Sequence, residues 1–180
     1  MQSSISDTRF RQVHSLVAHA IETRYRIAIV IGDVAPPFTG DLDGSEIRVD
    51  AKLDTEAMLF TLAHLFGHTV QWNISEDARR VGMSLPNNPS DAWLAKLRDY
   101  ELEAGRYSLQ LFHDVGVRDL DQWISDFSAC DWSYLEHFYR TGEKLLFRQF
   151  WREGTPLISP RPIPAFQPRK WIFRNAGIVI

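Results

Sequence analysis

The 180-residue sequence predicts one α+β domain that is mainly helical, with a small sheet and an extended proline-rich arm at its C-terminal end. Hydrophobic residues recur at helical spacing before residue 25 and again from residue 55 to residue 113. Two short β-branched segments lie between these regions. Helices that flank a few strands, rather than alternate with them, favour the α+β class. With 44% hydrophobic and 12% aromatic residues, the chain can bury one core of ordinary size.

The N-terminal third predicts a helix and two strands. Ser6 or Asp7 can cap the helix, which ends near Tyr25. Its hydrophobic face consists of Phe10, Val13, Val17 and Ile21. Residues 26–33, RIAIVIGD, are β-branched and apolar and predict the first strand. Residues 45–50, SEIRVD, alternate in polarity and predict the second strand, which we place at the edge of the sheet.

The middle of the chain predicts a series of helices. Asp54 caps a helix that runs from about residue 55 to residue 72. Its core face consists of Leu59, Leu62, Ala63, Phe66 and Val70. Ser90 caps the next long helix, which ends near His113. Two shorter helices are expected at 119–128 and 131–140, and Gly142 ends the second of them.

The last forty residues differ from the rest in proline content and charge. They hold five of the nine prolines, and each proline inside a helix costs about 3 kcal/mol, so they predict an extended arm or edge strands. Residues 141–180 carry seven Lys or Arg against two Asp or Glu, a sum of +5, which leaves −8 for residues 1–140. We therefore expect a metal-binding domain at 1–140 and a basic extension at 141–180 that packs on the same domain.

The bulk composition argues against several classes of partner. A net charge of −3 does not indicate nucleic-acid binding, and seven basic residues spread over forty favour a solvated surface. No apolar run is long enough to cross a bilayer, and the N-terminus lacks the apolar segment of a signal peptide, so no membrane is expected. Cys130 is the one cysteine, which is consistent with a reducing compartment. These features predict a cytoplasmic protein.

Two histidines in the second helix form a candidate metal site. His64 and His68 are four residues apart, which places them about 6 Å apart along the axis and on one face. Neutral imidazole is a common ligand of zinc, which takes four ligands in tetrahedral geometry. The alternative is a pair of partly buried histidines with ordinary hydrogen bonds.

Glu101 is the candidate for a third ligand. The apolar stripe of the third long helix consists of Leu94, Leu97, Ala104, Ser108 and Leu111, and position 101 is its missing member. The stripe therefore directs a carboxylate toward the core, whereas Glu103 is expected on a solvated face. A buried carboxylate must be paired or protonated, and a metal on the two histidines would satisfy it. The alternative is an ion pair with Arg24, Arg79 or another buried base.

Two segments resemble the ImmA/IrrE-like zinc metallopeptidases, within the wider gluzincin group. TLAHLFGH at 61–68 is similar to the TLAHELGH-type active-site helix, and ELEAGRYSLQLF at 101–112 is similar to the later E-x-x-A-(D/N)-x-(F/Y)-A segment. The resemblance covers about residues 5–113. It implies a zincin fold, zinc held by His64, His68 and Glu101, and a cleft for a peptide or protein segment that lies along residues 45–50. Family analogy also suggests a helix-turn-helix regulator as partner.

The sequence departs from the family motif at two positions. The motif is His-Glu-x-x-His, and its glutamate acts as general base, but here that position is Leu65. Loss of a general base typically costs about 10²–10⁴-fold in rate. We expect Leu65 to face the open cleft, so that Leu65→Glu would keep the fold and raise hydrolysis. Gly105 stands where the family usually has Asp or Asn, so the ligands need support from other groups.

Four functions fit these observations. The first is a metal-binding, peptidase-derived protein that has lost most hydrolytic activity and binds a peptide or protein. The second is an active zinc endopeptidase with a relocated base from Glu103, Asp50 or the C-terminal arm. The third is a metal-free interaction module on the same fold. The fourth is an ordinary α+β interaction module whose resemblance to the family is accidental.

Overall fold

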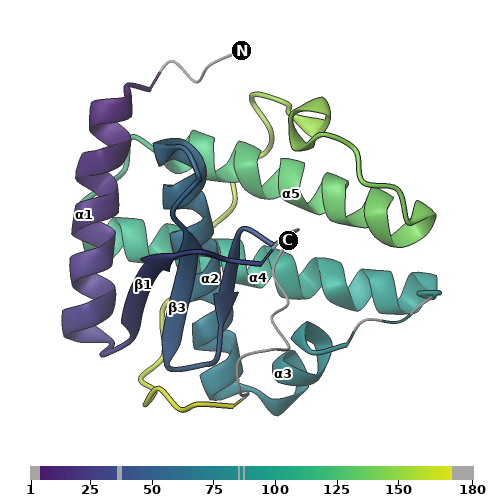
Figure 1. Ribbon diagram of the computed structural model, residues 1–180, viewed down its shortest axis with the longest axis horizontal. Helices are drawn as coiled ribbons and strands as arrows, with labels where there is room; N and C mark the ends of the chain where they lie inside the picture. The colour runs from purple at the N-terminus through teal and green to yellow at the C-terminus, as the bar shows by residue number, and fades with distance from the viewer. Residues whose placement is uncertain (1–4, 36–37, 85, 87, 172–180) are drawn as a thin grey trace.

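The computed structural model describes residues 5–35, 38–84, 86 and 88–171, which form an α+β fold. The elements in chain order are α1 (Asp7–Arg24), β1 (Ala28–Gly32), β2 (Gly40–Leu42), β3 (Glu46–Asp50), α2 (Thr55–Ile74), α3 (Glu76–Gly82), α4 (Asp91–Asp114), α5 (Asp121–Thr141) and the 3-10 helix η1 (Phe147–Phe150). In Figure 1 the small sheet and α1 lie on one side of α2, while α4 and α5 lie on the other. No helix among the described residues is both long and apolar enough to span a bilayer.

The sheet has three strands in the order β1-β3-β2. β3 pairs in parallel with β1 and antiparallel with β2, so both of its edges are occupied. The prediction that residues 45–50 form an edge strand is therefore wrong. β2 was not predicted from the sequence, because three residues that include Gly40 and Asp41 show no strand pattern of their own. Pairing with β3 makes them a strand.

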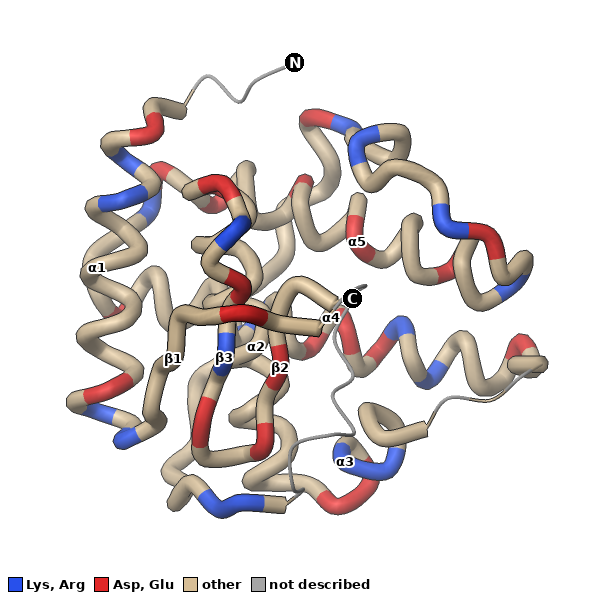
Figure 2. Tube along the Cα trace, viewed as in Figure 1, with Lys and Arg blue, Asp and Glu red and all other residues tan. Residues whose placement is uncertain are grey.

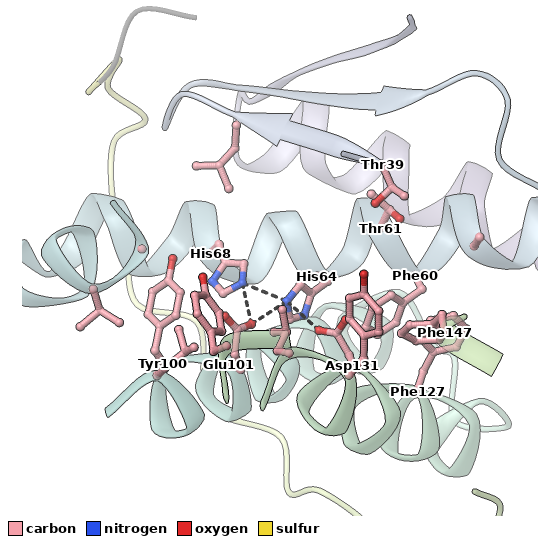
Figure 3. A pocket seen from close by; sticks show the side chains of 18 of the residues that line it. Thr39, Phe60, Thr61, His64, His68, Tyr100, Glu101, Phe127, Asp131 and Phe147 are labelled. Carbon is pink, nitrogen blue, oxygen red and sulfur yellow. Dashed lines mark hydrogen bonds and ion pairs between the residues drawn. The ribbon is translucent and has the colours of Figure 1, made fainter. Parts of the chain in front are cut away.

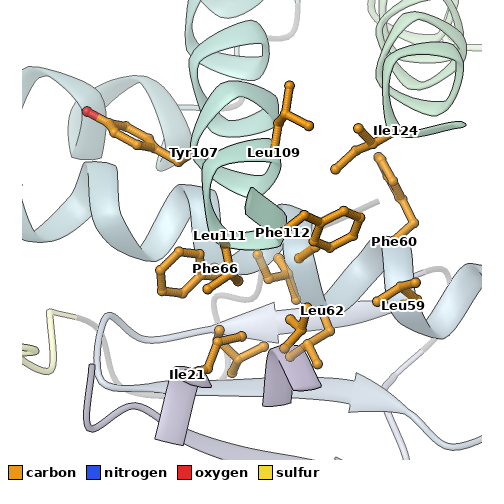
Figure 4. Close-up of a cluster of buried hydrophobic side chains, with 14 of the residues drawn as sticks. Ile21, Leu59, Phe60, Leu62, Phe66, Tyr107, Leu109, Leu111, Phe112 and Ile124 are labelled. Atoms are coloured by element: carbon orange, nitrogen blue, oxygen red, sulfur yellow. The ribbon is translucent and has the colours of Figure 1, made fainter. Parts of the chain in front are cut away.

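Helix α2 forms the centre of the core because neighbours cover it on every side. The predicted core residues Leu59, Leu62, Ala63, Phe66 and Val70 are all fully buried. Figure 4 shows Leu62 and Phe66 near Ile21 of α1 and Leu111 of α4, and Ile47 and Val49 of β3 belong to the same buried cluster. Helix α4 approaches α2 very closely at Gly67, where a Cβ atom would lie 2.2 Å from the carbonyl oxygen of Ala104. This approach brings the side chains one turn away on α4 within reach of α2.

Side-chain caps fix where the long helices begin. Ser6, Asp54 and Ser90 each accept a hydrogen bond from a backbone N–H in the first turn of α1, α2 and α4, which confirms the three predicted caps. Gly142 ends α5 in the left-handed conformation with φ of 71°, also as predicted.

The helices differ from the prediction at two places. The structure has one continuous helix, α5, where two short helices were expected at 119–128 and 131–140. Its buried residues, which include Phe127, Cys130 and Tyr134, follow one stripe through the expected break. The seven-residue helix α3 was not predicted, because it follows α2 after the single residue Ser75 and has no fully buried face.

The chain after α5 wraps around the helices and returns to the sheet. From Gly142 to Trp171 the described residues contain η1 and otherwise neither helix nor strand, so the alternative of edge strands was wrong there. Arg161 N donates to the Arg106 carbonyl of α4 at 3.1 Å, and Trp171 N donates to the Asp43 carbonyl beside β2 at 2.7 Å. Figure 2 shows basic and acidic positions interspersed along the trace. Ion pairs from Arg161 to Glu103 and from Lys170 to Asp43 link this basic segment to the acidic body.

Candidate metal centre

The structure brings His64 and His68 of α2 together with Glu101 of α4 (Figure 3). The Nε2 atoms of the two histidines are 2.9 Å apart. Glu101 Oε2 lies 3.0 Å from Nε2 of His64 and 3.1 Å from Nε2 of His68. Three ligand-type atoms therefore converge on one point from two helices.

The expected alternative partners of Glu101 are engaged elsewhere. Arg24 donates to the carbonyl of Asp114, and Arg79 donates to the carbonyl of Trp72. Burial by itself would raise the pKa of Glu101, but the charge of His68 and the hydrogen bonds of both histidines outweigh it and lower that pKa to about 2. The carboxylate is therefore ionised and directed at the two imidazoles.

Gln71, one turn along α2, sets the tautomer of a neutral His68. The Gln71 amide donates to the carbonyl of Tyr100 at 2.9 Å and to Oε2 of Glu103 at 2.7 Å. Both partners only accept, so the amide nitrogen and oxygen of Gln71 cannot be exchanged. Gln71 Oε1 is then the acceptor for His68 Nδ1, 2.9 Å away. A neutral His68 consequently carries its proton on Nδ1 and presents an unprotonated Nε2 to the cluster.

An unprotonated Nε2 on His68 faces the Glu101 carboxylate and Nε2 of His64. A proton on His64 Nε2 can be directed at either Glu101 or His68 but not at both, whereas a cation binds all three lone pairs at once. Two imidazoles and a carboxylate are a donor set that zinc takes in catalytic sites. The residues present fit a divalent transition metal.

The surroundings of His64 differ from those of His68. Nδ1 of His64 is buried and has no hydrogen-bond partner among the described residues. The ring stacks on Phe60 with centroids 5.2 Å apart. Nε2, the nitrogen that also faces Glu101 and His68, lies 3.7 Å from Oδ2 of Asp131, which comes from α5. This is too long for a hydrogen bond.

Asp131 is a functional candidate that sequence reasoning missed. Its relative exposure is 8%, and burial, reinforced by the nearby Glu101 charge and opposed by His64, raises its pKa to about 7. The signal that found Glu101 was also present here, because Asp131 lies on the buried stripe of α5. Dividing α5 into two short helices hid that stripe.

A cavity of about 280 Å³ adjoins the three converging groups and Asp131. Most of its lining is apolar or aromatic, with contributions from Leu42, Phe60, Leu97, Phe127, Tyr134 and Phe147. Figure 3 shows Phe60, Phe127 and Phe147 grouped at the end of the cavity nearest His64 and Asp131. The arrangement can therefore hold an apolar group beside a metal ion.

Leu65 does not face this cavity. Its relative exposure is 0%, and a Cβ atom built on Gly40 would lie 2.6 Å from Leu65 Cδ1. The expectation that Leu65 faces the open cleft is therefore wrong. One residue along a helix turns a side chain by about 100°, which directs position 65 toward β2 rather than toward the cavity.

The carboxylates proposed from the sequence as a relocated base do not line the cavity either. Asp50 accepts a hydrogen bond from the backbone N–H of Lys52. Glu103 was expected on a solvated face, but both of its carboxylate oxygens are engaged: Gln71 donates to one and Arg161 pairs with the other. Gly105 faces α5, where a Cβ atom would lie 3.0 Å from Oγ of Ser128. A larger residue there would be directed at α5 rather than at the histidines.

Comparisons of the chain with known protein families, with curated proteins and with solved structures gave no significant match.

Proposed function

We propose that this chain is a zinc-binding protein with a zincin-like site, and that its cavity receives an apolar segment of a peptide or protein. His64 Nε2, His68 Nε2 and the Glu101 carboxylate are the protein ligands. The observation that carries the proposal is the hydrogen bond from His68 Nδ1 to Gln71, because in the neutral ring it leaves Nε2 as the free lone pair, within 3.1 Å of two further ligand atoms.

The placement of the ligands supports a zincin-like arrangement. Two histidines lie one turn apart on a central helix, the glutamate lies on the next long helix, and the three-stranded sheet packs across that central helix. Zinc bound there would act as a Lewis acid and would lower the pKa of a water molecule that it holds. The same donors also suit ferrous iron, so the identity of the metal has to be measured.

The edge of the sheet beside the cavity supports a peptide or protein segment as the occupant. β2 lies at one edge of the sheet, and Thr39 and Leu42, which adjoin or belong to it, line the cavity. An extended segment can add to such an edge through main-chain hydrogen bonds while its side chains enter neighbouring pockets. β3, where the peptide was first expected, has both edges paired and offers no such place.

The test is elemental analysis of protein purified without added metal and without chelator. We expect about one zinc per chain, and removal with a chelator should lower the melting temperature, because a metal held at 100 times its Kd stabilises the folded form by about 2.7 kcal/mol. Glu101→Ala should lose the metal, while Glu136→Gln, a change at a half-buried residue of α5 that pairs with Arg140, should keep it. An untreated preparation without stoichiometric transition metal would overturn the proposal, and stoichiometric iron would overturn the choice of zinc.

Asp131 favours a second candidate function, a zinc-dependent hydrolase. Such an enzyme needs a group that accepts the proton of the attacking water, and position 65 cannot supply it because it is buried against β2. Asp131 lines the cavity, and its Oδ2 lies 3.7 Å from the same His64 Nε2 that is proposed to bind the metal. Its carboxylate would take that proton in place of the missing motif glutamate.

Turnover of an unfolded protein substrate separates the two functions. If the second candidate is correct, the zinc-loaded protein cleaves the substrate, and Asp131→Asn lowers the rate by about 10²–10⁴-fold while the zinc content is unchanged. Glu136→Gln serves as the matched control and should cleave at the normal rate. Absence of zinc-dependent turnover in the unmodified protein rejects the hydrolase and leaves the binding function.

A further inference from the structure

A chain of polar contacts connects the C-terminal segment to the candidate ligand His68. Arg161, in the irregular segment after α5, lies 2.6 Å from Oε1 of Glu103. The other carboxylate oxygen of Glu103 accepts from the Gln71 amide at 2.7 Å. Gln71 in turn accepts from His68 Nδ1 at 2.9 Å. Four residues from three separate parts of the chain thus form one continuous path from the surface to the cluster.

Each member of this path is held in place by further contacts. Gln71 is fully buried, and its second amide hydrogen goes to the carbonyl of Tyr100. The segment around Arg161 is fixed to α4 by hydrogen bonds in both directions, from Arg161 N to the carbonyl of Arg106 and from Arg106 Nε to the carbonyl of Ser159. The path therefore has one geometry, in which each donor meets an acceptor.

We propose that Gln71, Glu103 and Arg161 are positioning residues, through which the C-terminal segment holds His68 in the tautomer that binds metal. This inference rests on the proposed function. The Glu103 carboxylate polarises the Gln71 amide, which makes Oε1 a stronger acceptor for Nδ1–H and Nε2 a more basic ligand. Arg161 keeps the carboxylate aligned. Residues 142–171 then act on metal affinity without contacting the metal.

The expected effects differ along the path. Loss of an outer partner of a metal-ligating histidine typically lowers metal affinity by about 10–100-fold, and we expect this for Glu103→Ala. Glu103→Gln should recover part of the loss, because its amide oxygen can still accept from Gln71. Arg161 is 48% exposed in its side chain, so Arg161→Ala should weaken zinc by only about 2–5-fold.

Zinc affinity is measured by competition with a chelating dye on the full-length chain, with Lys170→Ala as the matched control. Lys170 also pairs a C-terminal base with a carboxylate of the body, Asp43 at 3.5 Å, but Asp43 lies beside β2 and is not a member of the path from Arg161 to His68. Lys170→Ala should bind zinc like the unmodified protein. An equal loss in Lys170→Ala and Glu103→Ala would show that general packing of the segment matters and would overturn the proposal.

A second readout does not depend on metal. Long-range ¹H–¹⁵N spectra of the zinc-free protein report which nitrogen of His68 carries the proton. We expect the Nδ1–H form in the unmodified protein and a mixture of tautomers in Glu103→Ala. A single unchanged tautomer in both proteins would overturn the positioning role even if the protein binds zinc normally. Absence of zinc binding with the tautomer shift present would instead overturn the proposed function alone.

Discussion

The two histidines of the candidate centre are held in different ways. His68 donates from Nδ1 to Gln71 and stacks on Tyr100 with ring centroids 4.4 Å apart. His64 stacks on Phe60, and its buried Nδ1 has no hydrogen-bond partner among the described residues. Both imidazoles contact Glu101 through Nε2, but only Nδ1 of His68 is held by polar contacts that reach the surface.

This difference separates two tasks within one site. On the His68 side, α4 and the C-terminal segment provide a hydrogen-bond network that fixes the ligand before any metal arrives. On the His64 side, α5 contributes Asp131 and the apolar wall of the cavity. Changes on the first side are expected to alter metal affinity, and changes on the second side to alter what the cavity binds or does.

The largest expected effect is the loss of metal when a ligand is removed. His64→Ala and His68→Ala should each abolish stoichiometric zinc, because both Nε2 atoms converge on the same point. Elemental analysis and the melting temperature with and without chelator provide the measurement. If one of the two variants kept its zinc, the two histidines would differ in whether they bind metal at all, and not only in how they are held.

The convergence of the three candidate ligands could be predicted from the sequence because it depends on helix periodicity. Residues four apart lie on one face of a helix, as His64 and His68 do. Glu101 is the charged residue in an otherwise largely apolar stripe. Both patterns are local. The three helix caps were predictable for the same reason, since Ser6, Asp54 and Ser90 each bond within three residues.

The features that the sequence did not predict depend on contacts between distant segments. β2 is a strand only because β3 pairs with it, and Gln71 acts on His68 only because Tyr100 and Glu103 of α4 fix its amide. Asp131 could have been found by the stripe argument if α5 had been predicted as one helix. The direction of Leu65 follows from the position of the sheet, which a family motif does not specify.

Leu65→Glu tests whether residue 65, where the family motif has its glutamate, could supply a general base to the cavity. The side chain is fully buried and packs toward Gly40 of β2, so an ionised carboxylate there should destabilise the zinc-free protein by at least about 3 kcal/mol. Leu65→Met is the control and should cost less than about 1.5 kcal/mol. Urea unfolding measures both. A stable Leu65→Glu protein that gains zinc-dependent hydrolysis would show that position 65 reaches the cavity.

A smaller effect is expected from Asp131→Asn, and it depends on pH. The folded-state pKa of Asp131 is about 7, above the ordinary value of 3.8, so the folded protein holds this proton more tightly than the unfolded chain does. The resulting stability is fully present below about pH 4 and is lost as the pH rises toward 7. Glu101, with a pKa lowered to about 2, acts in the opposite direction and only below its ordinary value of 4.5. The pH ranges over which Asp131 and Glu101 change the stability therefore barely overlap.

Between pH 5 and pH 8 the difference in unfolding free energy between the zinc-free unmodified protein and Asp131→Asn isolates the buried carboxylate. An asparagine mimics the protonated acid, so the variant should equal the unmodified protein near pH 4 and exceed its stability by about 1–3 kcal/mol at pH 8. Glu136→Gln should show no such pH-dependent gain. Parallel stability profiles for the unmodified protein and Asp131→Asn would mean that Asp131 is solvated or paired, and the His64 side would then lack the reactive carboxylate that distinguishes it from the His68 side.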